Sequence, residues 1–422
     1  MIPGSITRGF TRWYAQNRIL TWICALTFVN QLGFGAIVPA VPLYARSFGV
    51  SLTAIGLTIA GYGLARLLSS LPAGQISDRF GRTHALAIGG IITVVGNILC
   101  ALAATYELFL AARFIAGLGA GFILTASQIM LADISAPERR GRIMATYSGV
   151  FGFAVGLGPL PGGILADRVS LAAPFWAFAA MAALAALLAW SRVPETRTLR
   201  TVTGGQPSAR HGASGNASAK LPFLAQVRLM TVQPGFLVVT LVGFVIFFSR
   251  TGGLFNVIPV LGQERLGLTP DQIGLGLASV SIMSIILSYP SGALTDRFGR
   301  KPVIVPAVIL TGVSFLLFLL APSFGWFMAA CIAWSIAGGI GGAAPSAYAA
   351  DIAPPGMNAA AMSTFRMLAE TGYVLGPIVL GLVADFFGAE SALGWTAAFL
   401  VVVGLLFGVL APEKRRRPSA AS

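Results

Sequence analysis

Residues 74–82 read GQISDRFGR, and residues 292–300 read GALTDRFGR, so the chain carries one loop sequence twice. Asp78 and its copy Asp296 lie 218 residues apart. A match at one motif is common by chance, but several matches at one ungapped offset are not. The offset therefore predicts two homologous halves. Other segments related by it are Ile55-Gly56 and Ile273-Gly274, Ala132-Asp133-Ile134 and Ala350-Asp351-Ile352, Gly158-Pro159 and Gly376-Pro377, and Ala166-Asp167 and Ala384-Asp385.

The composition places both halves in a membrane. Of the 422 residues, 56% are hydrophobic and 10% are charged, whereas a soluble domain has about 25% charged residues. Apolar runs recur, each close to the about 20 residues that a helix needs to cross the hydrocarbon core. Such runs do not fit the alternating pattern of a membrane β-barrel. We predict an all-α membrane protein with twelve transmembrane helices, at residues 20–43, 54–76, 85–104, 108–132, 143–166, 174–191, 235–258, 272–293, 302–321, 326–349, 359–383 and 393–411.

The repeat and the spans together predict three parts of the chain. Residues 1–192 would form one six-helix bundle, and residues 234–422 would form a second, ending in a short basic tail. Residues 193–233 would form a cytoplasmic linker, because the stretch 201–219 is rich in Gly, Ser, Thr and Ala and cannot bury a core. Two pseudo-symmetric bundles place a binding site at their interface, near the middle of the bilayer, which favours a transporter.

The formal net charge of +14 follows the topology of the spans. With both termini cytoplasmic, most of the 28 Lys and Arg residues lie on the cytoplasmic side. On the opposite, non-cytoplasmic side of the membrane we expect only Arg46, Arg168 and Arg265. This bias predicts a multi-pass protein of the inner (plasma) membrane with both termini in the cytoplasm, and no nucleic-acid partner.

The chain shows no constellation typical of an enzyme. It has no Gly-x4-Gly-Lys-Ser/Thr phosphate loop, so nucleotide hydrolysis is not expected. Its three cysteines lie in separate predicted spans, and its two histidines lie in a loop and in the linker. We therefore predict that the protein is not an enzyme and has neither a metal site nor another cofactor.

The duplicated loop resembles the motif between helices two and three of the major facilitator superfamily. The resemblance implies that fold, a working monomer, and a charge cluster that latches the outward-facing conformation. We expect close helix contacts at Gly74 and Gly292, and tight turns at Gly81 and Gly299. The residues that the resemblance assigns to the cluster are Gly74, Asp78, Arg79, Gly81 and Arg82, their copies Gly292, Asp296, Arg297, Gly299 and Arg300, and Asp133.

The fifth predicted span resembles the antiporter motif of the same superfamily. It contains a glycine, eight residues, Gly-Pro, two residues, and Gly-Gly. Small residues let membrane helices pack closely, which leaves generic helix packing as the alternative interpretation. The resemblance implies export by antiport rather than import by symport. The residues concerned are Gly149, Gly158, Pro159, Gly162 and Gly163.

Ionisable residues within the spans are the candidates for proton coupling. Arg113 and the glycines that follow it resemble a helix-four motif linked to proton transfer. Glu370 is the one acid that we place well within a span, four residues from Arg366, so the two can pair on one helical face. A buried carboxylate tuned by an arginine can bind and release a proton. The alternative is a static Arg366–Glu370 pair.

The substrate candidates combine polar and aromatic side chains. The first span has Asn30 and Gln31 where several relatives have an acid, which argues against simple transfer of a cation mechanism. If Arg366 and Glu370 neutralise each other, the remaining intramembrane arginines leave excess positive charge, which favours an anionic or zwitterionic amphiphile. The candidates are Asn30, Gln31, Arg66, Arg250, Asn256, Phe34, Tyr147, Phe247 and Tyr373.

The resemblance and the residues lead to one functional hypothesis. The protein is identified as a member of the twelve-span drug:proton antiporters, which export a small drug or metabolite by alternating access using the proton gradient. Its expected partners are the small-molecule substrate, protons and the lipid bilayer. Two alternatives stay open: a proton-coupled importer of a small organic anion, and a lipid flippase or transport-inactive sensor on the same fold.

Overall fold

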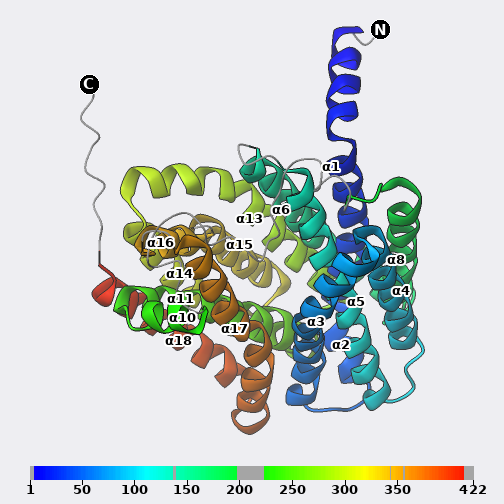
Figure 1. The fold of residues 1–422 in the computed structure, drawn as a ribbon. Helices are drawn as coiled ribbons and strands as arrows, with labels where there is room; N and C mark the ends of the chain where they lie inside the picture. The colour runs from blue at the N-terminus through cyan, green and yellow to red at the C-terminus, as the bar shows by residue number, and fades with distance from the viewer. Residues whose placement is uncertain (1–3, 136–138, 197–222, 343, 355–356, 413–422) are drawn as a thin grey trace, which may run out of the picture. The chain divides into compact units, whose positions relative to one another are not determined.

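The computed structural model describes residues 4–135, 139–196, 223–342, 344–354 and 357–412, and these residues form helices and no strands (Figure 1). Among them, 12 helical stretches are long and apolar enough to cross a membrane. The predicted fold class and number of spans are therefore confirmed. Chain contacts divide the protein into two compact units, residues 1–50 with 61–207 and residues 51–60 with 208–422.

The first unit is built around α1, which packs against α6 and α8, while α4 packs against α5 and α8. The predicted span 20–43 is two helices, because Pro39 has no N–H to continue the helical hydrogen bonds. The predicted span 143–166 likewise divides into two helices at Gly158-Pro159. The helices are α1 (Gly4–Ile37), α2 (Ala40–Ser47), α3 (Leu52–Phe80), α4 (Arg82–Ala101), α5 (Tyr106–Ile134), α6 (Arg140–Leu157), α7 (Pro159–Arg168) and α8 (Ala173–Arg192).

The second unit repeats this plan. In it, α11 packs against α17 and α18, and α14 packs against α15 and α18. The seventh span is continuous but changes to a π-helix, η3, in its middle. The helices are α10 (Phe223–Thr231), α11 (Pro234–Phe248), η3 (Ser249–Val257), α12 (Ile258–Leu266), α13 (Pro270–Phe298), α14 (Lys301–Leu319), α15 (Phe324–Gly341), α16 (Ala344–Ile352), α17 (Asn358–Phe387) and α18 (Ala389–Leu410).

Two features depart from the expected boundaries of the parts. Residues 51–60, the start of α3 and the loop residue before it, belong to the second unit. There Asp385 accepts hydrogen bonds from the backbone N–H groups of Leu52 at 2.8 Å and Thr53 at 2.9 Å, so a carboxylate caps the positive end of α3. In the expected linker, residues 223–231 form α10, while residues 197–222 lie outside the described residues.

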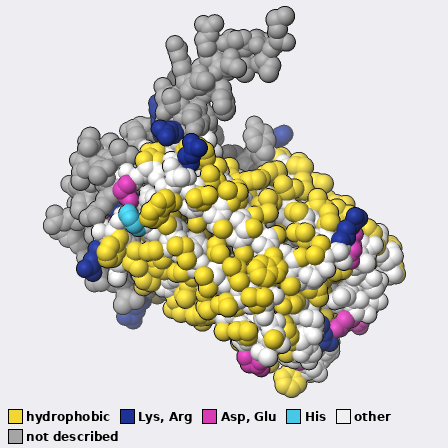
Figure 2. Space-filling model, turned by 90° about the vertical axis from the view of Figure 1, so that its right-hand side faces the viewer, with side chains coloured by type: hydrophobic (Ala, Val, Ile, Leu, Met, Phe, Trp, Pro, Cys, Tyr) yellow, Lys and Arg dark blue, Asp and Glu magenta, His cyan; other side chains and the backbone are white. Residues whose placement is uncertain are grey.

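The outer surface is largely hydrophobic, as a membrane helix bundle requires (Figure 2). Figure 2 shows a face covered by hydrophobic side chains, with most charged side chains at its margins. In α4 and α8, large apolar side chains project outward, including Ile91, Leu187 and Trp190, each at least 60% exposed. Such a surface is stable in a lipid environment because the surrounding acyl chains are equally apolar.

Candidate functional site

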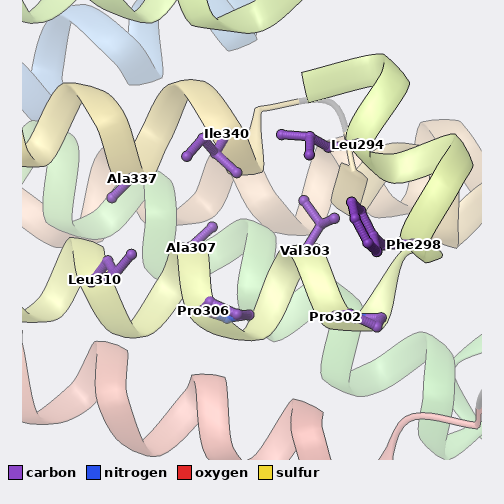
Figure 3. A pocket seen from close by; sticks show the side chains of 9 residues that line it. All are labelled: Leu294, Phe298, Pro302, Val303, Pro306, Ala307, Leu310, Ala337 and Ile340. Atoms are coloured by element: carbon purple, nitrogen blue, oxygen red, sulfur yellow. The ribbon is translucent and has the colours of Figure 1, made fainter. Parts of the chain in front are cut away.

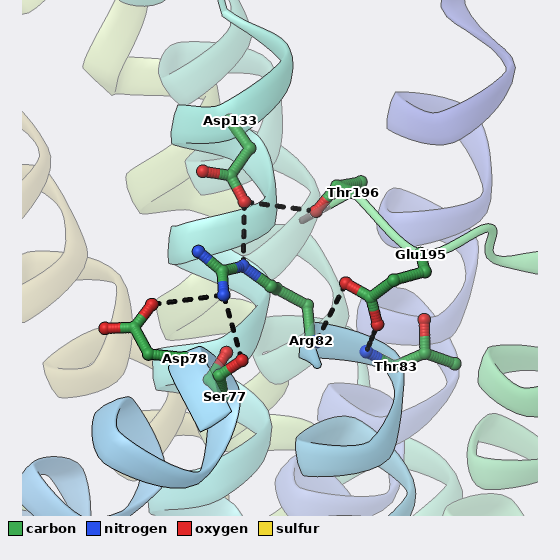
Figure 4. A network of polar contacts seen from close by, with 7 residues as sticks. All are labelled: Ser77, Asp78, Arg82, Thr83, Asp133, Glu195 and Thr196. Atoms are coloured by element: carbon green, nitrogen blue, oxygen red, sulfur yellow. Dashed lines mark hydrogen bonds and ion pairs between the residues drawn. The ribbon is translucent and has the colours of Figure 1, made fainter. Parts of the chain in front are cut away.

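The duplicated loop of the first unit forms a buried ionic network around Arg82 (Figure 4). The guanidinium Nε lies 2.9 Å from Oδ2 of Asp133, and Nη1 lies 3.1 Å from Oδ1 of Asp78. Nη1 also donates to the carbonyl of Ser77 at 2.9 Å. The side chains of Arg82 and Asp133 are 2% and 5% exposed, whereas that of Asp78 is 67% exposed, so Asp133 is the buried counter-charge of Arg82.

Glu195 completes this network, and sequence reasoning missed it. Its carboxylate accepts the backbone N–H groups of Arg82 at 3.0 Å and Thr83 at 3.2 Å (Figure 4), which caps the start of α4. The neighbouring Thr196 donates to Asp133 at 3.2 Å. A signal was present, because the 218-residue offset relates Pro194-Glu195 to Pro412-Glu413, although Glu413 lies outside the described residues.

The copy in the second unit keeps the central pair in a more open setting. Arg300 Nε lies 2.9 Å from Oδ2 of Asp351, but their side chains are 18% and 51% exposed. Arg300 also donates to the carbonyl of Thr295 at 3.0 Å, as Arg82 does to Ser77. The side chain of Asp296 lies outside the described part of the chain.

The glycines and outer arginines of the two loops divide into different roles. Gly81 and Gly299 have φ angles of 108° and 92°, which fits the expected tight turns. The close contacts expected at Gly74 and Gly292 are wrong for the described part of the chain, where a Cβ at either position would meet nothing within 4 Å. Both glycines lie on open helix surface. Arg79 and Arg297 stack on the neighbouring rings of Phe80 and Phe298, with guanidinium-to-centroid distances of 5.2 and 5.3 Å.

The antiporter motif packs α7 and the end of α6 against α1. A Cβ on Gly158 would lie 2.5 Å from the Cα of Gly35, and one on Gly162 would collide with the backbone of Ala36. The helices therefore touch backbone to backbone at these glycines. Pro159 begins α7, and Gly163 is buried beside it. Gly149 differs, because a Cβ there would meet nothing within 4 Å.

Arg113 is a deeply buried intramembrane charge among those that the sequence singled out. Its side chain is 3% exposed, and its guanidinium lies 4.4 Å from the ring centroid of Tyr62. Tyr62 stacks in turn on Phe34 at 5.4 Å. Within the described residues, Nε and Nη1 of Arg113 have no hydrogen-bond partner. A buried cation with two unused donors is a ready binding group for an anion.

The other polar candidates of the first unit lie on α1, α3 and α6. Asn30 is 2% exposed and donates to the side-chain carbonyl of Gln31 at 3.0 Å. Its Oδ1 has no partner among the residues that the structure describes. Arg66 is half-buried on α3, one turn after Tyr62. Tyr147, also a candidate, packs in the hydrophobic core with Leu20, Met130 and Val193.

The second unit gathers its polar candidates at the π-helix η3. Asn256 is fully buried and donates to the carbonyl of Pro377 at 3.1 Å, while its Oδ1 has no partner among the described residues. Arg250 stacks on Phe255 at 5.4 Å. A π-helix widens the turn and often marks a functional position. Phe247 accepts through its carbonyl from Thr251, which also donates to the carbonyl of Tyr373.

The expected Arg366–Glu370 pair is present. Nε of Arg366 lies 2.8 Å from Oε1 of Glu370, and the two side chains are 61% and 25% exposed. The two candidates for proton coupling thus differ: Glu370 has a cation beside it, whereas Arg113 has an aromatic ring. In the described ranges, no group of His, Cys, Asp or Glu residues has the arrangement of a metal site.

Comparison with known proteins identifies the fold family. The model of the Major Facilitator Superfamily matches residues 23–269 and 239–422. Multidrug resistance protein 2 of Bacillus subtilis is 24% identical over 409 residues, which cover 96% of this chain and 98% of that protein. The class C tetracycline resistance protein of Escherichia coli is 26% identical over 410 residues, which cover 95% of this chain and 97% of that protein.

A solved structure supports the same architecture. The crystal structure of the human organic anion transporter MFSD10 is 21% identical in sequence, with a TM-score of 0.63. The similarity covers 93% of this chain and 99% of that one.

Proposed function

The chain belongs to the major facilitator superfamily, and from that premise we propose that it exports small amphiphilic organic compounds in exchange for protons by alternating access. Such transporters are not enzymes; the energy source that we propose is the proton gradient, with no cofactor. The buried, incompletely satisfied guanidinium of Arg113 is the observation that carries the proposal. Burial of a charge is costly, so its unused donors favour an anionic ligand group.

The aromatic stack beside Arg113 supports an amphiphilic rather than a purely polar substrate. The ring of Tyr62 lies against the guanidinium of Arg113, and the ring of Phe34 stacks on Tyr62, so apolar surface adjoins the cation. A compound with a carboxylate or other electron-rich group on an aromatic or aliphatic body would match both parts. The relative named as an organic anion transporter fits this chemistry, and those named as resistance proteins fit export.

Proton coupling is proposed for Glu370. In this structure the carboxylate of Glu370 pairs with Nε of Arg366 at 2.8 Å. Protonation of Glu370 would remove that attraction and release Arg366. The Arg366–Glu370 pair would then exist in a paired and an unpaired state. Such a change can bias two conformations when the pair exists in only one of them.

The test is proton movement in inverted membrane vesicles with an acidic interior. Anionic, zwitterionic and cationic amphiphiles are added in turn to the parent protein and to Arg113→Gln and Glu370→Gln. We expect an anionic or zwitterionic compound to release protons with the parent and with neither variant. Arg228→Gln, which removes an exposed arginine of α10, is the control and should behave as the parent. A response to cations alone, or full activity in Arg113→Gln, would exclude the proposed substrate class.

The same guanidinium favours one second candidate, an importer of a small organic anion with protons. The two functions differ in the direction of flux. Radiolabelled substrate should enter inverted vesicles if the protein exports from cells, and should leave preloaded inverted vesicles if the protein imports. Retention of the substrate on the loaded side in both formats would favour a sensor without transport.

A further inference from the structure

A groove of about 280 Å³ lies between α13, α14 and α15 of the second unit (Figure 3). Leu294 and Phe298 of α13 line one end of it, Val303 and Ala307 of α14 form one wall, and Ala337 and Ile340 of α15 form the opposite wall. Among the described residues, no side chain that lines the groove is polar. An apolar cavity of this kind does not favour water.

The groove follows from a difference between the two halves. The 218-residue offset relates Ala307 and Ala337 to Gly89 and Gly119 of the first unit. A Cβ on Gly89 would lie 2.9 Å from the carbonyl oxygen of Gly119, so α4 and α5 touch backbone to backbone there. In the second half, Ala307 and Ala337 stand at these positions and line the groove, and the Cβ of Ala307 would lie 2.8 Å from a Cβ on Gly341 of α15. The backbone contact between Gly89 and Gly119 in the first half is therefore replaced by contact through alanine side chains in the second.

One end of the groove is positively charged. Phe298, which is 55% exposed at that end, carries the guanidinium of Arg297 over its ring at 5.3 Å. Lys301 follows at the first position of α14, whose N-terminus adds a partial positive charge. Arg300 pairs with Asp351 at 2.9 Å and Lys301 donates to the carbonyl of Ala411 at 3.0 Å, so Arg297 is the cation at this end that stacks on a ring of the groove itself.

We propose that this groove binds one acyl chain of an anionic phospholipid, with the phosphate at Arg297 and the first turn of α14. The α14 wall runs from Pro302 to Leu310, about 12 Å along a helix axis, which lies within half the thickness of a hydrocarbon core. The groove therefore has apolar walls at acyl-chain depth and cations at headgroup depth. Basic residues at the membrane surface attract anionic headgroups. The proposal does not rest on the proposed transport function.

The experiment is native mass spectrometry of the full chain, purified in mild detergent and incubated with equal amounts of phosphatidylglycerol and phosphatidylethanolamine. Arg297→Gln removes the proposed headgroup contact, and Ala307→Leu fills the groove. Arg79→Gln is a matched control, because Arg79 is the repeat equivalent of Arg297, also stacks on a phenylalanine, and stands where α4 and α5 are closed. Val313→Phe, on an exposed position of α14 outside the groove, controls for added bulk.

We expect the parent to retain phosphatidylglycerol in preference to phosphatidylethanolamine. Arg297→Gln should lower phosphatidylglycerol affinity about five-fold, the factor that corresponds to about 1 kcal/mol per basic residue. Ala307→Leu should lower the binding of both lipids, while Arg79→Gln and Val313→Phe bind as the parent. Equal effects of Arg297→Gln and Arg79→Gln, or unchanged binding in a folded Ala307→Leu protein, would overturn the proposal. Thermal unfolding in detergent establishes that each variant is folded.

Discussion

Arg82 and Arg300 occupy equivalent positions in the two halves, yet their surroundings give the same ion pair different energetic weight. Arg82 and Asp133 are almost fully buried, whereas Asp351 is half exposed beside Arg300. Breaking a buried pair leaves a charge without compensation, but an exposed charge is solvated by water. The two halves therefore allow the stabilisation from one Arg–Asp pair to be compared between a buried and a partly exposed setting.

Asp133→Ala should lower the free energy of unfolding by about 3 kcal/mol, the lower end of the range for a broken buried pair, because Asp78 still contacts Arg82. Asp351→Ala, its repeat equivalent, should cost about 0–1 kcal/mol. Titration with a denaturing detergent, followed by tryptophan fluorescence, measures both. Equal losses in the two variants would show that burial does not set the weight of this pair.

The turn glycines give a second comparison at single-residue scale. Gly81→Ala should destabilise the protein by about 1–3 kcal/mol, because φ at this position is 108° and a Cβ would lie 2.4 Å from a carboxylate oxygen of Glu195. Gly74→Ala should be neutral or slightly stabilising, since the position is helical and open. Thermal unfolding of both variants in one detergent checks this; a stable Gly81→Ala protein would contradict the strain argument.

Individual residues also show how far the sequence could go. Asp78, Arg82 and Asp133 were predicted because a repeated motif marks them, and the structure brings all three together. Glu195 was not, although the same 218-residue offset relates Pro194-Glu195 to Pro412-Glu413. A two-residue match gives no indication of a partner, and only the fold shows that this carboxylate reaches the backbone of Arg82.

At the scale of elements, the apolar runs predict the spans well, since length and hydrophobicity decide them. The interruptions were harder to predict. The break between α1 and α2 lies at Pro39 and so has a local cause in the sequence. Many membrane helices nevertheless continue through a proline. The π-helix η3 contains no proline that would mark it in the sequence, and it packs against α17.

Helix packing in the first unit leads to a prediction about the antiporter motif. Gly158→Ala should separate α1 from the α6–α7 junction, because backbone atoms of Leu32, Gly35 and Ala36 leave no room for a methyl group. Overpacking of this kind costs about 1–3 kcal/mol. Gly149→Ala lies in the same motif with open space around it, so it should be tolerated and should gain helix propensity.

The measurement is substrate flux in vesicles, normalised to folded protein, together with the unfolding temperature. If Gly158→Ala and Gly149→Ala lose flux equally, the motif acts through something other than contact with α1. If Gly158→Ala melts at the parent temperature with full flux, the close packing has no functional weight.

At the scale of the whole molecule, the repeat predicted two homologous halves, and the chain forms two compact units. The division is not purely sequential, because residues 51–60 of the first half pack with the second unit. Asp385 holds this segment through the backbone of Leu52 and Thr53. The repeat could not show this, since it describes what the halves share and this contact joins residues of different halves.

The orientation of the chain yields the last prediction. Twelve spans place both termini on one side of the membrane, and the distribution of Lys and Arg decides which side. Alkaline phosphatase is active only outside the cytoplasm, so it should be active when inserted after Ser170, between α7 and α8, and inactive when fused after Leu410. A fluorescent protein that folds only in the cytoplasm should show the opposite pattern. Replacing Arg139, Arg140 and Arg142 with Gln should weaken this preference, because these residues belong to the positive charge that we expect on the cytoplasmic side. Phosphatase activity in the C-terminal fusion of the parent would show that the topology is the reverse of the predicted one, and the expected direction of transport would then be reversed as well.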